Sequence, residues 1–303
     1  MSRNINLKKK TVVIVLVIIA ILCLVIPFGG RNGSFRDFLG KVGYAYQRCG
    51  NSEGVFAFYN VENADASFVY TNQSIGLIDT GLKETAGILL KNLNKLNVNT
   101  LDFVVITHPH SDHAGGYLEL IKEIQIKRLF IGLYTQKDFN NISLYNEIIK
   151  TSNQMGIEVI YVTYGLTVTL GDIHLQFYDG SHSSSDENHN SLLVKATIGS
   201  KSCLYTGDAG QQAELLLLNL GCDLKADILK VGHHGSNSAS SEAFLQAVSP
   251  NYSVISVGFN DFGHPHPETI HRLAEADTRV YRTDICEKIL FQVQENTVGV
   301  TVE

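Results

Sequence analysis

The pattern of apolar and polar positions predicts a few β-strands first and alternating strands and helices afterwards. Short apolar runs rich in β-branched and aromatic residues lie at 55–59, 67–70 and 74–78, with turn residues between them, as in a β-meander. Residues 83–96 have apolar positions at helical spacing, and a buried strand is predicted at 101–106. We expect the alternation to continue with a helix from residue 114, a strand at 128–131, a helix at 143–155 and a strand at 159–162.

The second half of the chain repeats this order, with hairpins before the alternating elements. The hairpins pair strands at 166–170 and 173–178 and then strands at 191–198 and 202–206. Predicted after them are a helix at 211–220, a strand at 227–231, a helix at 241–248, a strand at 252–257, a helix ending at 276 and strands at 279–282, 289–293 and 298–302. Two such runs indicate an α/β protein in which two sheets pack together with helices outside them.

The first 28 residues have the composition of a membrane anchor. Residues 1–10 contain four basic residues and no acidic one, and residues 11–28 are almost entirely apolar. This apolar length is at the lower limit for a membrane-spanning helix, and no small-residue cleavage site follows it. We therefore expect a single-pass transmembrane signal anchor, with residues 1–10 in the cytoplasm and the large domain outside the cell. A protein secreted after signal cleavage is the alternative.

The remaining composition is that of an ordinary globular domain. Residues 29–53 are rich in Gly, Arg, Asn and Ser and are expected to be a linker, and residues 54–303 are expected to form one large domain. The net charge of −6 counts against a tight, non-specific hold on long nucleic acid. Cysteines occur at positions 49, 203, 222 and 286 without Cys-x-x-Cys spacing, so we expect most of them to be free.

Candidate chemistry is concentrated where the strand at 101–106 ends. Three histidines and one aspartate lie within six residues, and imidazole with carboxylate suits zinc or a neighbouring first-row metal. His108 and His110 lie two residues apart on an extended loop, point the same way and can chelate one ion. Asp112 and His113 lie in the first turn of the following helix and can reach a second ion.

Three other predicted strands also end in polar side chains. Asp79, Asp208 and the pair His233 and His234 each follow an apolar run. Because loops at one edge of packed sheets can converge on a single pocket, we expect these groups to lie near the first motif. Asp208 can supply a carboxylate that both ions share, and one of the paired histidines can complete the shell of the second ion.

Together these motifs resemble the metallo-β-lactamase superfamily over nearly the whole chain from Val55 onward. Within it, the chain is most similar to the metallo-β-lactamase domain of ComEC-like competence proteins and to their small secreted relatives. The matching segments are residues 77–81, 107–116, 190–194, 205–208, 229–236 and 263–268. The resemblance implies a four-layer αββα sandwich with a binuclear metal centre at one edge, so that residues 54–303 are expected to be a hydrolase domain.

The resemblance also implies a set of metal ligands. It assigns His108 and His110 to one ion, Asp112, His113 and His234 to the other, and Asp208 to a position between them. His233 is then a nearby proton donor, although the sequence leaves open which member of the histidine pair is the ligand. His264, in the matching loop at 263–268, is a candidate for contacting substrate.

Two places in the sequence raise questions about the family pattern. One leaves open which residue completes the first ion's shell, and the other differs from the family's turn. Many superfamily hydrolases complete the first ion's shell with another histidine, whereas the ComEC-like pattern has asparagine there, matched by Asn190. The adjacent His189 could substitute for it. The relatives also carry a Gly-Gln-Gly-Asp turn, where this chain has Glu62, Asn63, Ala64 and Asp65. The aspartate is retained, but the local turn is expected to differ.

The expected activity is metal-dependent hydrolysis. Two divalent ions, zinc or manganese, ionise a bridging water near neutral pH and stabilise developing negative charge. Asp112 can orient this nucleophile, and His233 or His264 can protonate the leaving oxygen. The resemblance implies phosphodiester bonds as the target, in DNA, a cell-surface polymer or a small molecule. No obligate protein partner is inferred.

Two alternatives keep the fold. The first is hydrolysis of a β-lactam or a thioester, which a clear third histidine on the first ion would favour. The second is a non-catalytic domain that a metal stabilises and that binds a nucleic acid or a polymer. The nearly complete ligand set counts against this second alternative.

Overall fold

The computed structural model of the protein describes residues 48–136, 138–139, 142–179 and 187–303. The residues from Arg48 to Glu303 form one compact unit. The predicted cytoplasmic N-terminus and signal anchor lie outside the described residues, as does the predicted linker up to residue 47. Among the helices of the described part, none has the length and apolar character needed to cross a membrane.

The start of the described chain packs against the domain. Cys49 is buried, and its backbone N–H donates to Oδ1 of Asn72 at 3.2 Å.

The cysteines at positions 49, 203, 222 and 286 are all free in the structure, as the sequence predicts for most of them.

One of two large sheets is built from the first half of the chain and its C-terminal hairpin. Its order is β17-β16-β1-β2-β3-β5-β7-β8. The strands are β1 (Gly54–Tyr59), β2 (Ala66–Thr71), β3 (Ile75–Thr80), β5 (Phe103–Ile106), β7 (Arg128–Ile131), β8 (Glu158–Tyr161), β16 (Lys288–Gln294) and β17 (Thr297–Val302). The meander is antiparallel, whereas β3, β5, β7 and β8 run parallel. The C-terminal strand β16 pairs with β1, so both ends of the domain meet in this sheet.

The second large sheet is built from the remaining strands in the order β15-β14-β13-β12-β11-β10-β9. They are β9 (Thr167–Leu170), β10 (Ile173–Asp179), β11 (Leu192–Ile198), β12 (Lys201–Tyr205), β13 (Ile228–Lys230), β14 (Tyr252–Ile255) and β15 (Arg279–Arg282). The two hairpins are antiparallel, and β12 to β15 run parallel. Both sheets therefore change from antiparallel to parallel pairing along the chain, as the order of predicted elements indicates.

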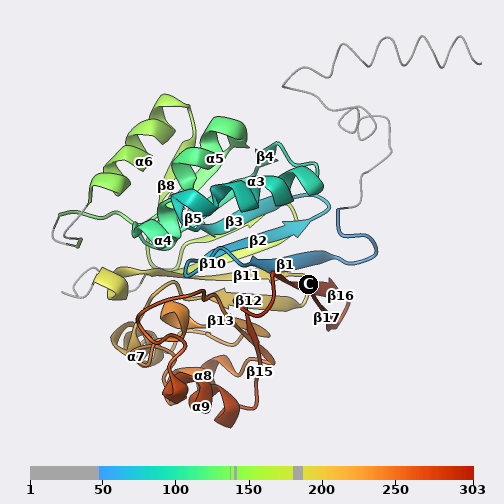
Figure 1. Ribbon diagram of the computed structural model, residues 1–303, viewed down its shortest axis with the longest axis vertical. Helices are drawn as coiled ribbons and strands as arrows, with labels where there is room; N and C mark the ends of the chain where they lie inside the picture. The colour runs from blue at the N-terminus through green and yellow to red at the C-terminus, as the bar shows by residue number, and fades with distance from the viewer. Residues whose placement is uncertain (1–47, 137, 140–141, 180–186) are drawn as a thin grey trace, which may run out of the picture. The chain divides into compact units, whose positions relative to one another are not determined.

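Helices cover the outer face of each sheet (Figure 1). On the first sheet lie η2 (Lys83–Thr85), α3 (Ala86–Lys95), α4 (Ser111–Ala114), α5 (Tyr117–Glu123) and α6 (Ser143–Gln154), and on the second α7 (Gln211–Asn219), α8 (Glu242–Val248) and α9 (Pro267–Glu275). Two short 3₁₀ helices, η3 (Glu187–Asn190) and η4 (Gly232–Gly235), lie in loops. The predicted αββα sandwich is confirmed.

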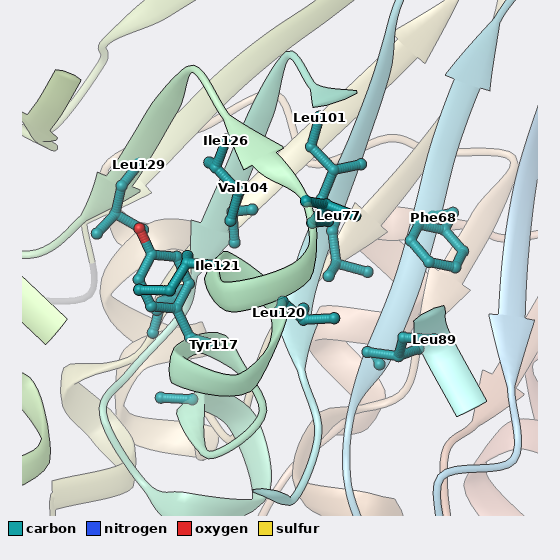
Figure 2. Close-up of a cluster of buried hydrophobic side chains, with 14 of the residues drawn as sticks. Phe68, Leu77, Leu89, Leu101, Val104, Tyr117, Leu120, Ile121, Ile126 and Leu129 are labelled. Atoms are coloured by element: carbon teal, nitrogen blue, oxygen red, sulfur yellow. The ribbon is translucent and has the colours of Figure 1, made fainter. Parts of the chain in front are cut away.

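Three apolar cores separate the four layers, and β1 shows how the sequence builds them. Its side chains alternate: Val55, Ala57 and Tyr59 face the helices, whereas Phe56 and Phe58 face the second sheet. Figure 2 shows the helix-facing core, where side chains of α3 and α5 pack onto the strands. The third core lies between the second sheet and α7 to α9. The central strands of the first sheet are thus buried on both faces. This packing fixes the position of their carboxyl ends.

The structure corrects two predicted elements. The predicted strand at 101–106 is interrupted at Asp102, and Leu101 belongs instead to a small separate sheet of β4 (Thr100–Leu101) and β6 (Gln125–Ile126). The helix predicted from residue 114 begins earlier, at Ser111, and is divided at Gly115 and Gly116 into α4 and α5. A Cβ at Gly116 would lie 2.2 Å from the carbonyl oxygen of Thr80, so the chain passes too close to β3 for any side chain there.

Candidate metal centre

The proposed ligands come from the carboxyl ends of parallel strands in both sheets. The six side chains that we call the His–Asp cluster are His108, His110, Asp112 and His113 after β5, Asp208 after β12, and His234 after β13. Residues at the carboxyl ends of parallel strands share one edge of a sheet, and that edge is where α/β proteins bind ligands. Packing the sheets face to face brings the two edges together. The structure therefore assembles the group that the sequence predicts.

His113 is fixed from behind by Asp79. The Nδ1–H of His113 donates to Oδ2 of Asp79 at 2.9 Å, and the ring is fully buried. Asp79 also accepts from the backbone N–H and the hydroxyl of Thr107, both at 2.8 Å. This arrangement leaves Nε2 of His113 facing Oδ1 of Asp208 at 3.1 Å. A histidine whose outer nitrogen donates to a carboxylate presents its other nitrogen as a metal ligand in a defined orientation.

His108 and His110 present two nitrogens to one point. Nε2 of His108 and Nδ1 of His110 lie 3.1 Å apart. On the outer side, Nδ1 of His108 lies 3.2 Å from the hydroxyl of Ser191, and the Nε2–H of His110 donates to Glu187 at 2.8 Å. The structure thus brings the two predicted ligands together, and Glu187 is a hydrogen-bond partner of His110 that the sequence did not indicate.

A strained turn places His234. His233 and His234 both have left-handed backbone conformations, with φ of 50° and 52°, which cost about 1–2 kcal/mol each for residues with a Cβ. The turn lets Nδ1–H of His234 donate to the carbonyl of Ser256 at 2.9 Å. Nε2 of His234 then lies 3.3 Å from Asp112 and 3.8 Å from Asp208. Backbone strain of this kind is concentrated at functional sites.

Asp208 lies between the two halves of the cluster. Its Oδ1 faces Nε2 of His113 and of His234, whereas its Oδ2 lies 4.0 Å from Nε2 of His108 and 3.6 Å from Nε2 of His233. The ligand atoms of Asp112, His113, Asp208 and His234 all lie within 4.8 Å of one another. The predicted position of Asp208 between two ion sites is consistent with this geometry.

The charges of the cluster favour a bound cation. Burial alone would lower the pKa of His113, but Asp208, Asp79 and Asp112 raise it well above its ordinary value. Burial would raise the pKa of Asp208, and the imidazoles of His113 and His234 instead hold it well below its usual range. Burial lowers the pKa of His108. Buried carboxylates thus stay ionised by attracting positive charge, which a proton or a metal ion can supply.

The donor atoms also fit a metal. Within the described ranges, Nε2 of His113 and Oδ1 of Asp208 are buried and lack the alignment of a hydrogen bond. Buried polar atoms are nearly always hydrogen-bonded, so a cation that contacts both of these atoms would satisfy them. Imidazole nitrogens and carboxylate oxygens together suit zinc, manganese or iron. The domain therefore contains a candidate metal-binding cluster.

A buried ion pair lies beneath the cluster. The sequence did not predict it as part of the site. Nζ of Lys230 lies 2.5 Å from Oδ2 of Asp65, and both side chains are almost fully buried. The carboxylate of Asp65 also lies 3.6 Å from Nδ1 of His234 and 3.7 Å from Nδ1 of His113. One sequence signal could have revealed the pair: a lysine within the apolar strand β13 must find a carboxylate.

The remaining predicted residues lie around the cluster. His233 and His264 have ring centroids 5.5 Å apart, and burial with the surrounding imidazoles lowers the pKa of His264 to about 4. The ring of His189 covers Gly210, where a Cβ would lie 2.3 Å from its Nε2. Asn190 is buried, and its Nδ2 donates to the carbonyl of Asp138 at 3.1 Å. The amide nitrogen of Asn190 thus has a structural partner.

Known proteins share both the sequence pattern and the fold. The chain is 30% identical over 273 residues to ComE operon protein 3 of Bacillus subtilis, covering 83% of this chain and 34% of that protein. It is 28% identical over 284 residues to competence protein ComA of Neisseria gonorrhoeae, covering 92% and 38%. The chain thus spans well under half the length of either relative. The metallo hydrolase Igni18 of Ignicoccus hospitalis has the same fold, with a TM-score of 0.53 at 19% identity over 79% of this chain and 100% of that one.

The family model for the metallo-β-lactamase superfamily matches residues 59–258. This range contains all six side chains of the His–Asp cluster and most of both sheets. Because the match covers more than half of the chain and the αββα layers agree with it, the chain belongs to the metallo-β-lactamase superfamily, and its relatives include competence proteins.

Proposed function

We propose that the chain is a hydrolase that uses two divalent metal ions to cleave phosphodiester bonds. The observation that carries this proposal is the position of Asp208, whose two carboxylate oxygens face different halves of the cluster. A carboxylate in that position can bridge two ions. Such a pair is suited to phosphoryl oxygens because it neutralises charge on both the attacking and the leaving side.

The residues divide into two ligand groups. His108, His110 and Oδ2 of Asp208 would hold one ion, and Asp112, His113, His234 and Oδ1 of Asp208 would hold the other. Nitrogen and oxygen donors of this kind accept zinc first and manganese as an alternative. When bound, the ions supply an ionised water near neutral pH and stabilise negative charge on the substrate.

The protein's own groups position the nucleophile and the leaving group. Asp112 is the most exposed carboxylate of the cluster, with 29% of its side chain accessible, so it can orient a water that enters from solvent. His233 lies beside Asp208, and the ring of His264 lies beside that of His233. A bound phosphate would favour a protonated imidazole there, and either ring could then give its proton to the leaving oxygen.

A comparison of four substrates tests the proposal. The full-length protein, loaded with zinc or with manganese, is assayed against single-stranded DNA, a chromogenic phosphodiester, a thioester and a chromogenic β-lactam, beside Asp112→Asn. We expect turnover of the phosphodiesters and a loss of about 100-fold or more in the variant. Equal rates for both proteins would contradict the catalytic proposal, and preference for the β-lactam or the thioester would contradict the substrate class.

We further propose that residues 11–28 anchor the protein in the membrane with the large domain outside the cell. The basic residues before this apolar segment support that orientation. Added protease should then degrade the large domain on intact cells. Protection of the domain until the cells are lysed would contradict the proposed orientation.

A further inference from the structure

A loop beside the cluster presents two phenylalanine rings to solvent. The loop joins β14 to α9, and within it Phe259 is 95% exposed and Phe262 is 71% exposed. Single exposed apolar side chains are common on protein surfaces. Phe259 is almost entirely in water and Phe262 buries only part of its surface, so the two rings contribute little to the stability of the fold. Their position is better explained by contact with a ligand.

The loop has a fixed backbone. Nδ2 of Asn260 donates to the carbonyls of Gly258 and His264, both at 2.9 Å. Oδ1 of Asn260 accepts from the backbone N–H groups of Phe262 at 3.1 Å and His264 at 3.0 Å. One amide side chain therefore makes four hydrogen bonds across the loop. The phenyl rings are displayed on a preorganised support, which reduces the entropic cost of binding.

The loop also rests closely on the first sheet's meander. A Cβ at Gly258 would lie 2.4 Å from the backbone carbonyl carbon of Glu62, so only glycine allows this approach. Glu62 begins the turn that ends at Asp65, where the family's glycine-containing turn is replaced. The exposed rings are thus anchored on both sides, by Asn260 within the loop and by Gly258 against this turn.

A row of aromatic rings connects the cluster to the loop. The ring of His233 lies beside Asp208, and the ring of His264 lies 5.5 Å from that of His233 between centroids. The ring of Phe262 follows at 5.6 Å from His264, with an angle of 28° between the two planes. A ligand that is held at the cluster and extends past His233 and His264 would therefore reach Phe262.

We propose that Phe262 and Phe259 form a stacking platform for the bases of a single-stranded nucleic acid whose phosphodiester lies at the His–Asp cluster. This inference rests on the proposed function and names its substrate class. Every nucleobase has a flat π-face, so aromatic rings bind bases with little regard to sequence. The phosphate and the base of one nucleotide could then be held together.

The single open face of the Phe262 ring favours this ligand over a polymer that carries quaternary ammonium groups. An aromatic cage surrounds a cation with several ring faces. Here His264 meets His233 at 72°, but the ring of Phe262 stacks on His264 at 28° and contacts no other ring among the described residues, so its other face is open and flat. The net charge of −6 opposes a phosphate backbone, and basic residues contribute little to holding one. Stacking is the contact that remains available for binding along the strand.

Binding of single-stranded DNA tests the platform directly. The full-length, zinc-loaded protein carries Asp112→Asn in every sample, so that the strand is not consumed. Fluorescence anisotropy measures binding of an end-labelled ten-nucleotide thymidine strand and of a matched strand with tetrahydrofuran abasic sites. We expect the thymidine strand to bind about tenfold more tightly or better, because stacking contributes strongly for each base. Phe259→Ala with Phe262→Ala should abolish that difference.

Two further variants separate stacking from general damage. Tryptophan at both positions should preserve the preference for bases. Met155→Ala removes another exposed apolar side chain, at the C-terminal end of α6, and should change nothing. Because all three side chains are exposed, unfolding curves of the variants should match that of the parent protein.

Several results would overturn the platform. Equal binding of the two strands, or a base preference that the double alanine variant retains, would remove stacking from the explanation. Displacement of the strand by phosphocholine, lost in the double variant, would assign the rings to a quaternary ammonium ligand. If no phosphodiester is hydrolysed by the protein with Asp112 intact, the proposed function fails, and the anisotropy comparison still decides whether the rings bind bases.

Discussion

The ammonium of Lys230 lies 2.5 Å from the carboxylate of Asp65, directly beneath the candidate metal centre. The pair is buried, and Asp65 also contacts the outer sides of His113 and His234. Lys230 thus neutralises a carboxylate that would otherwise add to the negative charge of Asp79, Asp112 and Asp208. The ion pair links the core of the second sheet to the two histidines that we assign to one ion.

Lys230→Met should therefore destabilise the protein strongly. It leaves Asp65 buried without its partner, which costs about 3–5 kcal/mol. Urea unfolding measures the loss. Lys201→Met, which breaks the partly exposed pair with Asp227 at 3.1 Å, is the matched control, and we expect a loss of about 1 kcal/mol or less. A Lys230 variant as stable as this control would show that the buried pair contributes little.

Asp79→Asn should weaken metal binding without removing a ligand. An amide is a poorer acceptor for the Nδ1–H of His113, so the ring loses both its orientation and part of its basicity. We expect metal affinity to fall about 10–100-fold. Competition with a chromophoric chelator measures the affinity. An unchanged affinity would mean that Asp79 supports only the backbone at Thr107.

The stability contributed by Asp102 should depend on pH. Burial raises its pKa, but hydrogen bonds from Lys127, from the N–H of Ile75 and from Ser74 outweigh burial, so the pKa lies below its ordinary value. A lowered pKa means that the carboxylate stabilises the fold at pH values above the unfolded pKa of about 3.9. This contribution disappears as the pH falls through the lower, folded pKa.

Asp102→Asn is the variant that shows this dependence. At pH 7 we expect it to be less stable than the parent by about 1–2 kcal/mol in urea unfolding. The difference should shrink as the pH is lowered below about 4, because the parent carboxyl becomes neutral as well. A difference that stays constant from neutral to acid pH would show that the hydrogen-bonding shape of the group matters and its charge does not.

Removal of metal should lower the thermal stability of the domain. Without a cation, the carboxylates Asp112 and Asp208 rely on protonated imidazoles for compensating charge. Zinc restored at a free concentration 100 times its dissociation constant should add about 2.7 kcal/mol. Melting curves after chelation and after zinc addition measure this effect. Asp208→Ala should respond much less, and an equal response would place the stabilising metal elsewhere.

Much of the fold could be predicted because its elements have clear periodicity. β7 and β15 have the predicted boundaries, and the order of strands and helices is the predicted one apart from the small β4–β6 sheet and the division of α4 from α5. The interruption at Asp102 was missed because its cause is a set of contacts with Ser74, Ile75 and Lys127, which are distant in sequence. Local patterns do not report such contacts.

The candidate site could likewise be predicted only in part. The six side chains of the His–Asp cluster could be named because each follows an apolar strand and matches a family motif. The residues that orient them had weaker signals. Glu187 reaches His110 from a polar loop 77 positions away in the chain. Asp65 was noted only as a retained residue of an altered turn, and its pairing with Lys230 depends on the packing of the two sheets.

Metal content measured on the purified full-length protein is the most direct test of the central claim. Elemental analysis after loading and desalting should find close to two zinc or manganese ions per chain. Asp208→Ala, which removes the carboxylate shared by both proposed sites, should retain fewer. A wild-type protein that holds no metal, or a variant that holds as much as the wild type, would contradict the account of a binuclear centre at this edge.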